Sequence, residues 1–151
     1  MPSLTDSIGV VLAASLSREE RAGKIAELIR SSGGYRWVGI YDVSPEQVSI
    51  IAYSGPGAPA FPQFPATNGL TGSAIGDKKT VVVGDVASDP RYLTAFGSTR
   101  SEIIVPILDK KTGVVIGTID VESEQANAFS AEDQKMLEAC SVAARALWIQ
   151  N

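Results

Sequence analysis

Histidine is absent from this 151-residue sequence, and cysteine occurs only once. The missing histidines exclude Ser-His-Asp triads, Cys-His pairs, histidine-ligated haem and most zinc sites. A single cysteine also excludes an intramolecular disulfide. Cys140 falls at helical spacing from Met136, Ala144 and Leu147. We therefore expect a buried, unreactive side chain at that position.

Runs of basic residues and long apolar stretches are missing as well. The net charge is -4, so the attraction that supports binding to nucleic acid or to an anionic membrane is lacking. The apolar stretches fall far short of the ~20 residues that span a bilayer. Residues 1–16 carry neither the basic segment nor the cleavage site of a signal peptide. We expect a cytoplasmic protein that binds neither nucleic acid nor membrane.

The apolar content of the chain indicates one compact domain over residues 1–151. Hydrophobic residues make up 44% of the sequence, and a chain of this length buries roughly two-thirds of its unfolded surface. A second domain would not fit. We expect N-terminal helices in 1–31, a sheet with a pocket in 35–122, and a C-terminal helix in 130–149.

Apolar periodicity predicts an α+β fold with an antiparallel sheet. Helical spacing covers residues 5–16, a second helix ends at Gly33 and Gly34, and a third begins near Ser130. Terminal helices are expected on one face of the sheet, and residues 55–100 as a lid over a cavity on the other. The remaining predicted elements are strands at 35–42, 47–54, 80–83, 101–108 and 114–122, a loop at 54–67 and a short helix at 69–76.

Acidic residues occur inside two of the apolar strands. Glu102 lies in the strand at 101–108, and Asp120 and Glu122 lie in the strand at 114–122. An ionised carboxylate is costly to bury without a partner, so a cation or water is expected beside them. The period of two in a strand also places Trp37 and Tyr41 on one face. Acids and aromatic walls together suggest a pocket for a small cation.

Short motifs spread along nearly the whole chain form a specific set. They are W-V-G-I-Y at 37–41, G-L-T-G-S-A at 69–74, V-V-V-G-D-V at 81–86, S-E-I at 101–103 with Pro106, G-T-I-D at 117–120, and F-S at 129–130 with Asp133. Together they resemble a GAF domain. The resemblance implies a central antiparallel sheet with a ligand pocket on one side.

Within this family the sequence most resembles the free methionine-(R)-sulfoxide reductases, which use cysteine chemistry in a closed pocket. The resemblance implies a site made of Trp37, Tyr41, Glu102, Asp120 and Glu122, with Glu122 where an Asp is usual. The family's three cysteines align with Phe61, Thr71 and Ala95. Reduction of a sulfoxide by a thiol cannot proceed without a thiolate.

The expected function follows from the retained pocket and the missing cysteines. We expect a stand-alone small-molecule-binding domain for an amino acid or an amine, acting as a sensor or regulatory module. We expect no sulfoxide reduction, no catalytic residue, no metal and no cofactor. A homodimer is expected, because residues 4–31 and 131–149 are long enough for helices that pair across a two-fold axis.

Each of these site residues also has an alternative explanation in which it serves the fold and binds no ligand. Trp37 and Tyr41 could be core aromatics, and Glu102 could pair with Arg100. Glu122 lies near a strand end, where exposure to solvent is the default. Strand alternation places Thr118 and Ile116 on the face of the acids, and Val115, Ile119 and Val121 on the other.

Other functions remain as alternatives. The domain could be a ligand-free dimerisation or interaction module, or an enzyme related to free methionine sulfoxide. Carboxylate catalysis by Glu102 and Asp120 ranks last, since no nucleophile or metal constellation supports it. The cyclic-nucleotide signature of some GAF domains is matched only by Phe129 and Asp133. Bilin and haem binding lack their cysteine and histidine ligands.

Overall fold

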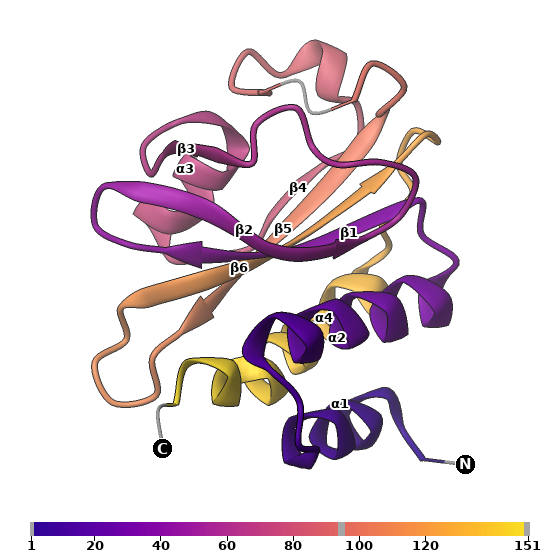
Figure 1. The fold of residues 1–151 in the computed structure, drawn as a ribbon. Helices are drawn as coiled ribbons and strands as arrows, with labels where there is room; N and C mark the ends of the chain where they lie inside the picture. The colour runs from indigo at the N-terminus through magenta and orange to yellow at the C-terminus, as the bar shows by residue number, and fades with distance from the viewer. Residues whose placement is uncertain (1, 94–95, 150–151) are drawn as a thin grey trace.

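A six-stranded antiparallel sheet organises the computed structural model, which describes residues 2–93 and 96–149. The strand order is β3-β2-β1-β6-β5-β4, and Figure 1 shows the sheet as a curved layer between two groups of elements. The strands are β1 (Trp37–Val43), β2 (Gln47–Ser54), β3 (Gln63–Pro65), β4 (Val81–Val83), β5 (Ser101–Leu108) and β6 (Val115–Ser123).

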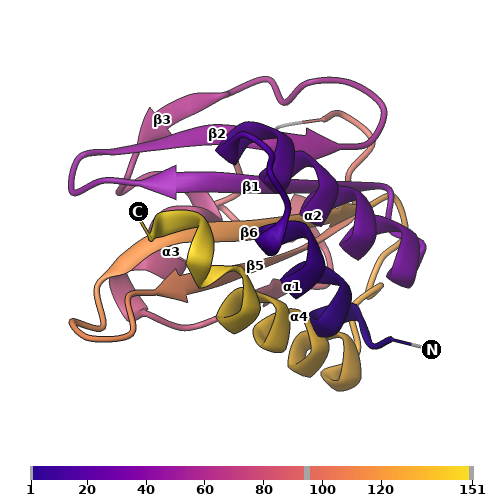
Figure 2. The same cartoon turned by 60° about the horizontal axis from the view of Figure 1, so that its bottom comes forward.

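Two helices, α2 (Arg18–Gly33) and α4 (Ala131–Ala143), pack on one face of the sheet. The first helix, α1 (Leu4–Ala13), packs against both of them on the side away from the sheet (Figures 1 and 2). Ser17 and Ser130 cap α2 and α4 by accepting backbone N–H groups, and Gly34 ends α2 in the left-handed conformation. Their apolar sides bury the main core with Val38 and Ile119 of the sheet. The predicted helical face is confirmed. No helix in residues 2–93 and 96–149 is long and apolar enough to cross a membrane.

The opposite face is covered by the middle of the chain, as predicted. It carries α3 (Gly69–Asp77), a 3-10 turn at Val86–Ser88 and the loops around them. Two smaller apolar clusters fill this layer, one around Leu70 and Ile104 and one around Trp37 and Tyr41. The side chains of these clusters pack the lid against the sheet, and Figure 1 shows the lid segment on the side of the sheet opposite the terminal helices.

Two secondary-structure elements differ from the sequence predictions. The loop expected at 54–67 contains the short edge strand β3, which pairs with the start of β2. The last helix does not continue to 149, because the α-helix ends at Ala143 and a 3-10 turn covers Ala144–Trp148. Arg18 fixes this turn: it donates to Leu147 O and to both oxygens of Asp42.

The alternation of β6 is interrupted near its start. Ile107 pairs with Gly117 and Leu108 with Val115, so Ile116 has no opposite residue on β5. This bulge turns Ile116 towards the helices, where it packs against the main core. The prediction that Ile116 shares a face with Asp120 is therefore wrong.

Candidate functional site

Residues of three central strands lie in cross-strand rows on the lid side of the sheet. One row joins Glu102 of β5, Glu122 of β6 and Trp37 of β1. The next joins Ile104, Asp120 and Gly39. Because successive side chains alternate between faces, these two rows bring all three acids to one side of the sheet.

The three carboxylates are buried and close together. Glu102, Asp120 and Glu122 are only 5%, 6% and 0% exposed, and one oxygen of each lies within 4.8 Å of the others. The expectation that Glu122 is exposed is wrong, because the lid covers this end of β6 and Thr99 donates to Glu122 Oε1 at 2.9 Å.

Within residues 2–93 and 96–149, no basic side chain forms an ion pair with these acids. The three ion pairs of the described residues join Arg18 to Asp42, Arg36 to Glu124 and Arg91 to Asp89. None of them involves Glu102, so the alternative of a Glu102–Arg100 pair is not supported. Burying three carboxylates without a cation costs free energy, and like charges opposite each other in a sheet add to it.

The buried environment raises the pKa values of all three acids. Burial, followed by the charge of Asp120, raises the pKa of Glu102 well above its ordinary value. Burial raises the pKa of Asp120 to about 6, although a hydrogen bond with Glu102 opposes the rise. Burial and the charge of Asp120 raise the pKa of Glu122 to about 8, against hydrogen bonds from Thr99 and Tyr92. The cluster therefore carries both carboxylic acids and carboxylates near neutral pH.

The two predicted aromatic residues share the face of the acids, as expected. The Trp37 and Tyr41 ring centroids are 6.5 Å apart, and burial, then the charge of Asp120, raises the pKa of Tyr41 far above its ordinary value. Trp37 is held by packing: its ring stacks on Tyr53, and its Nε1 donates to Gly57 O at 3.1 Å. Trp37 thus anchors the lid to β1.

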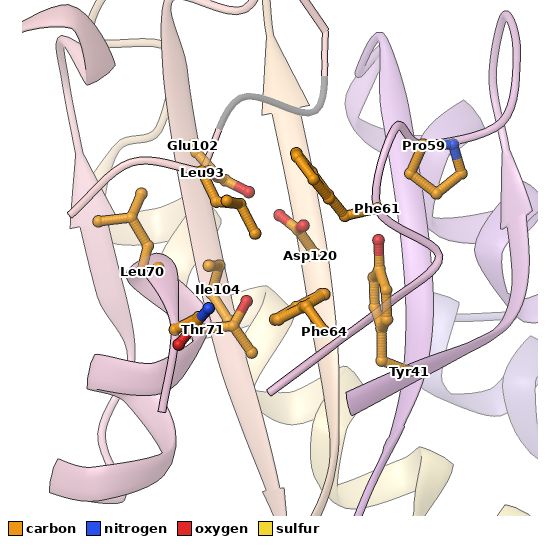
Figure 3. Close-up of a pocket in the computed structure, with 12 residues that line it drawn as sticks. Tyr41, Pro59, Phe61, Phe64, Leu70, Thr71, Leu93, Glu102, Ile104 and Asp120 are labelled. Carbon is orange, nitrogen blue, oxygen red and sulfur yellow. The ribbon is translucent and has the colours of Figure 1, made fainter. Parts of the chain in front are cut away.

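A small, partly open cavity of about 30 Å³ is lined by Glu102 and Asp120. Its volume suits one or two water molecules. Figure 3 shows the two carboxylates directed into this space, with aromatic side chains on one side and aliphatic side chains on the other. The lining residues are Tyr41, Pro59, Phe61, Phe64, Asn68, Gly69, Leu70, Thr71, Leu93, Glu102, Ile104 and Asp120.

The first turn of α3 forms another part of the cavity wall. Asn68 is the N-cap of this helix, but its side chain accepts no capping hydrogen bond. The backbone bonds of the helix begin with Gly72 N–H donating to Asn68 O. The N–H groups of Gly69, Leu70 and Thr71 therefore precede the helical ladder, and the helix dipole adds positive potential there.

The five predicted site residues divide into two groups. Tyr41, Glu102 and Asp120 line the cavity. Trp37 and Glu122 lie in the same cross-strand row as Glu102, but they are buried and are not part of the lining. The structure brings the five side chains into one region, and three of them face the space that a ligand could enter.

The positions of the family's cysteines have different surroundings. Phe61 and Thr71 both line the cavity, and Ala95 lies outside the described residues. Cys140 is fully buried in the main core on α4, on the opposite face of the sheet. Burial raises the pKa of its thiol to about 11, as expected for an unreactive cysteine.

Sequence reasoning missed most of the apolar walls. Phe64, Leu93 and Ile104 come from a short edge strand, a loop and a strand interior. The G-L-T-G motif at 69–72 marked α3, but the free N–H groups of its first turn were not recognised as part of the site. The alternation of β5 could have identified Ile104, which is two residues after Glu102.

Gly39 provides a direct test of the packing between the two aromatic side chains. A Cβ at this position would meet Trp37 Cη2 at 2.3 Å and Tyr41 Cε1 at 3.0 Å. We expect Gly39→Ala to lower the free energy of unfolding by about 1–3 kcal/mol through overpacking. Gly76→Ala is the control, because its Cβ meets nothing within 4 Å. Urea unfolding measures both variants, and equal stability of Gly39→Ala and wild type would contradict the packing described.

Comparison with known proteins gives consistent results. Residues 17–147 match the family model described as "GAF domain". GAF domain-containing protein A of Dictyostelium discoideum is 31% identical over 114 residues, 75% of this chain and 70% of that protein. Free methionine-R-sulfoxide reductase of Saccharomyces cerevisiae is 33% identical over 105 residues, 68% of this chain and 57% of that protein.

A solved structure extends the likeness to almost the whole chain. It is the free methionine-R-sulfoxide reductase from Neisseria meningitidis in complex with its substrate. The two chains are 27% identical, with a TM-score of 0.85, and the likeness covers 96% of this chain and 86% of that one.

Proposed function

Because the chain belongs to the GAF domain family, we propose that it binds a small free amino acid, or a related amine, as a sensor or regulatory domain. The observation that carries the proposal is the pair of buried carboxylates, Glu102 and Asp120, facing a small cavity. A ligand ammonium supplies the positive charge that the described side chains do not provide.

The part of the cavity wall formed by α3 favours an amino acid over a simple amine. The N–H groups of Gly69, Leu70 and Thr71 precede the hydrogen-bonded ladder of α3, and these residues line the cavity. Such groups attract a carboxylate. An ammonium beside Asp120 and a carboxylate beside α3 would match both ends of a zwitterion, and the apolar walls suit an apolar side chain.

Entry of a ligand requires the lid to open. The cavity of about 30 Å³ is much smaller than the roughly 300 Å³ or more of usual ligand pockets. The loop that carries Pro59 and Phe61 forms one wall, and Phe61 is 42% exposed. We infer that this loop moves outward to admit the ligand and closes over it.

A thermal-shift screen tests the proposal. The compounds are the free amino acids, free methionine sulfoxide, decarboxylated amines and cyclic nucleotides, each at millimolar concentration. A ligand at 100 times its Kd stabilises the folded state by about 2.7 kcal/mol, so at least one amino acid should raise the midpoint of unfolding clearly. If none of these compounds stabilises the protein, the ligand-binding proposal fails.

The same proposal includes the absence of reductase activity. Phe61 and Thr71 supply no thiol at the cavity, and Cys140 lies on the other face of the sheet. We expect no reduction of free methionine sulfoxide with dithiothreitol as reductant, in a chromatographic assay for methionine. Activity that Cys140→Ser abolishes would contradict the assignment of Cys140 as an inert core residue.

Dimerisation is a second candidate function, favoured by exposed apolar side chains on the helical face. Val10 of α1 is 71% exposed and Val142 of α4 is 54% exposed, and α1 packs beside α4. We propose that this face pairs with a second copy of the chain. Light scattering should give a dimer mass for the wild type and a monomer mass for Val10→Asp. A wild-type monomer at all concentrations tested would exclude this function.

A further inference from the structure

We propose that Glu102, Asp120 and Glu122 form a binding site for a divalent cation such as Mn²⁺, Mg²⁺ or Ca²⁺, directly beneath the ligand cavity. This site goes beyond the proposed function, because cation binding needs no organic ligand. It also replaces the sequence-based expectation that the chain holds no metal.

The spacing of the carboxylates matches the coordination of a divalent ion. One oxygen from each acid lies within 4.8 Å of the others. Oxygen ligands at ~2.1 Å from Mg²⁺ or at ~2.4 Å from Ca²⁺ are separated by about 3 to 5 Å around the ion. Hard carboxylate oxygens are the ligands that these cations and Mn²⁺ prefer. Small side-chain adjustments can therefore bring all three oxygens to one ion.

Unpartnered oxygens at the cluster provide independent support for a ligand. Asp120 is 94% buried, since only 6% of it is exposed, and its Oδ1 has no hydrogen-bond partner among the described residues. Its carboxylate is directed into the cavity in Figure 3. Thr118, two residues earlier on the same face, is fully buried, and its Oγ1 is also unpartnered in the described part of the chain. Each such oxygen loses hydration without replacement, which a bound cation would offset.

The position of Glu122 separates the cation site from the amine site. Glu102 and Asp120 line the cavity, whereas Glu122 is fully buried and is not part of the lining. An ammonium in the cavity can thus reach two of the acids, whereas the proposed cation binds Glu122 as well. A divalent cation would leave one of three negative charges uncompensated, and the ammonium of a ligand above it would balance that charge.

The groups that surround the three acids offer little positive charge. The groups that face the acids from neighbouring elements are Tyr41 on β1, Tyr92 and Thr99 in the segment before β5, and Arg36 before β1. Only Arg36 is cationic, and it pairs with Glu124. The neighbouring elements therefore leave the negative charge of the three acids largely without a cationic partner, and a bound divalent ion would supply one.

The experiment titrates Mn²⁺ into the full chain after treatment with a chelator and its removal. Free Mn²⁺ is measured by electron paramagnetic resonance without organic ligand. We expect one Mn²⁺ per chain at pH 8.0. Glu122→Gln should weaken binding at least about tenfold, because even partners outside the first coordination shell change metal affinity 10- to 100-fold. Glu27→Gln is the control, since Glu27 is exposed on α2.

Glu102→Gln is titrated in parallel, and circular dichroism shows whether each variant is folded. Wild-type protein that binds no Mn²⁺ at millimolar concentration and pH 8.0 overturns the cation site. Unchanged affinity in folded Glu122→Gln or Glu102→Gln overturns it as well. The amino-acid screen is run on chelator-treated protein, so its failure would contradict the ligand proposal alone.

Discussion

Glu122→Gln is expected to make the protein more stable at pH 8.5, because it removes a negative charge that is fully buried in the sheet. Glutamine keeps the shape of glutamate and can still accept the hydrogen bond from Thr99 to Glu122 Oε1. It removes a carboxylate that lies opposite Glu102 and close to Asp120. When the neighbouring acids are ionised, the substitution relieves this repulsion and so increases the free energy of unfolding.

The expected pH dependence follows from the raised pKa values. Burial and the charge of Asp120 raise the pKa of Glu122 from 4.5 to about 8, so the folded state binds more protons than the unfolded state between these values. Its contribution to stability is complete below pH 4.5 and is lost as pH rises to about 8. Asp120, whose pKa is raised by burial to about 6, acts in the same direction at lower pH. Wild-type stability should therefore fall between pH 5 and pH 8.5.

The measurement is urea unfolding with chelator present at pH 5.0 and pH 8.5. Each unit of pKa corresponds to about 1.4 kcal/mol, so with coupling among the acids Glu122→Gln should gain about 2–4 kcal/mol at pH 8.5. It should gain little at pH 5.0. Glu27→Gln should follow the wild type, because Glu27 is exposed. Wild-type stability that increases with pH would contradict the description of the cluster.

Asp120→Asn is expected to abolish most binding of an amino-acid ligand. Asp120 lines the cavity, lies in the middle strand of the site and has an unpartnered oxygen. Loss of one partner from a buried ion pair costs about 3–5 kcal/mol, which corresponds to a decrease in affinity of roughly 100-fold or more. Isothermal titration with the best amino acid from the thermal-shift screen measures this change.

Asp77→Asn is the matched control for this experiment. Asp77 is exposed at the end of α3 away from the first turn of that helix, so its variant should bind as the wild type does. If both variants keep wild-type affinity, the ligand does not contact the acids. Circular dichroism of Asp120→Asn excludes unfolding as the reason for lost binding.

Regular alternation allowed much of the site to be predicted from the sequence. Trp37 and Tyr41 share a face because β1 is regular between them on the side that pairs with β6. Asp120 and Glu122 share that face for the same reason. The prediction failed at Ile116, because a bulge adds one residue to β6 and shifts the alternation. Local sequence did not indicate this bulge.

The burial of Glu122 and the cavity walls depend on contacts between distant segments. Exposure was expected for Glu122 because it lies near a strand end, yet Thr99 covers it from a segment 23 residues away in the sequence. Phe61 and Leu93 both line the cavity, and they come from two different loops. Periodicity describes the faces of strands and helices, but it carries no information on how loops fold over them.

Recognition of an ammonium group by Asp120 and Glu102 is the central claim, and one pair of titrations tests it directly. Isothermal titration at pH 7.5 compares the best amino acid from the screen with the same amino acid acetylated on its nitrogen, which removes the positive charge. The account predicts measurable binding of the free amino acid and at least about 100-fold weaker binding of the acetylated form. Equal affinities for the two compounds would contradict it.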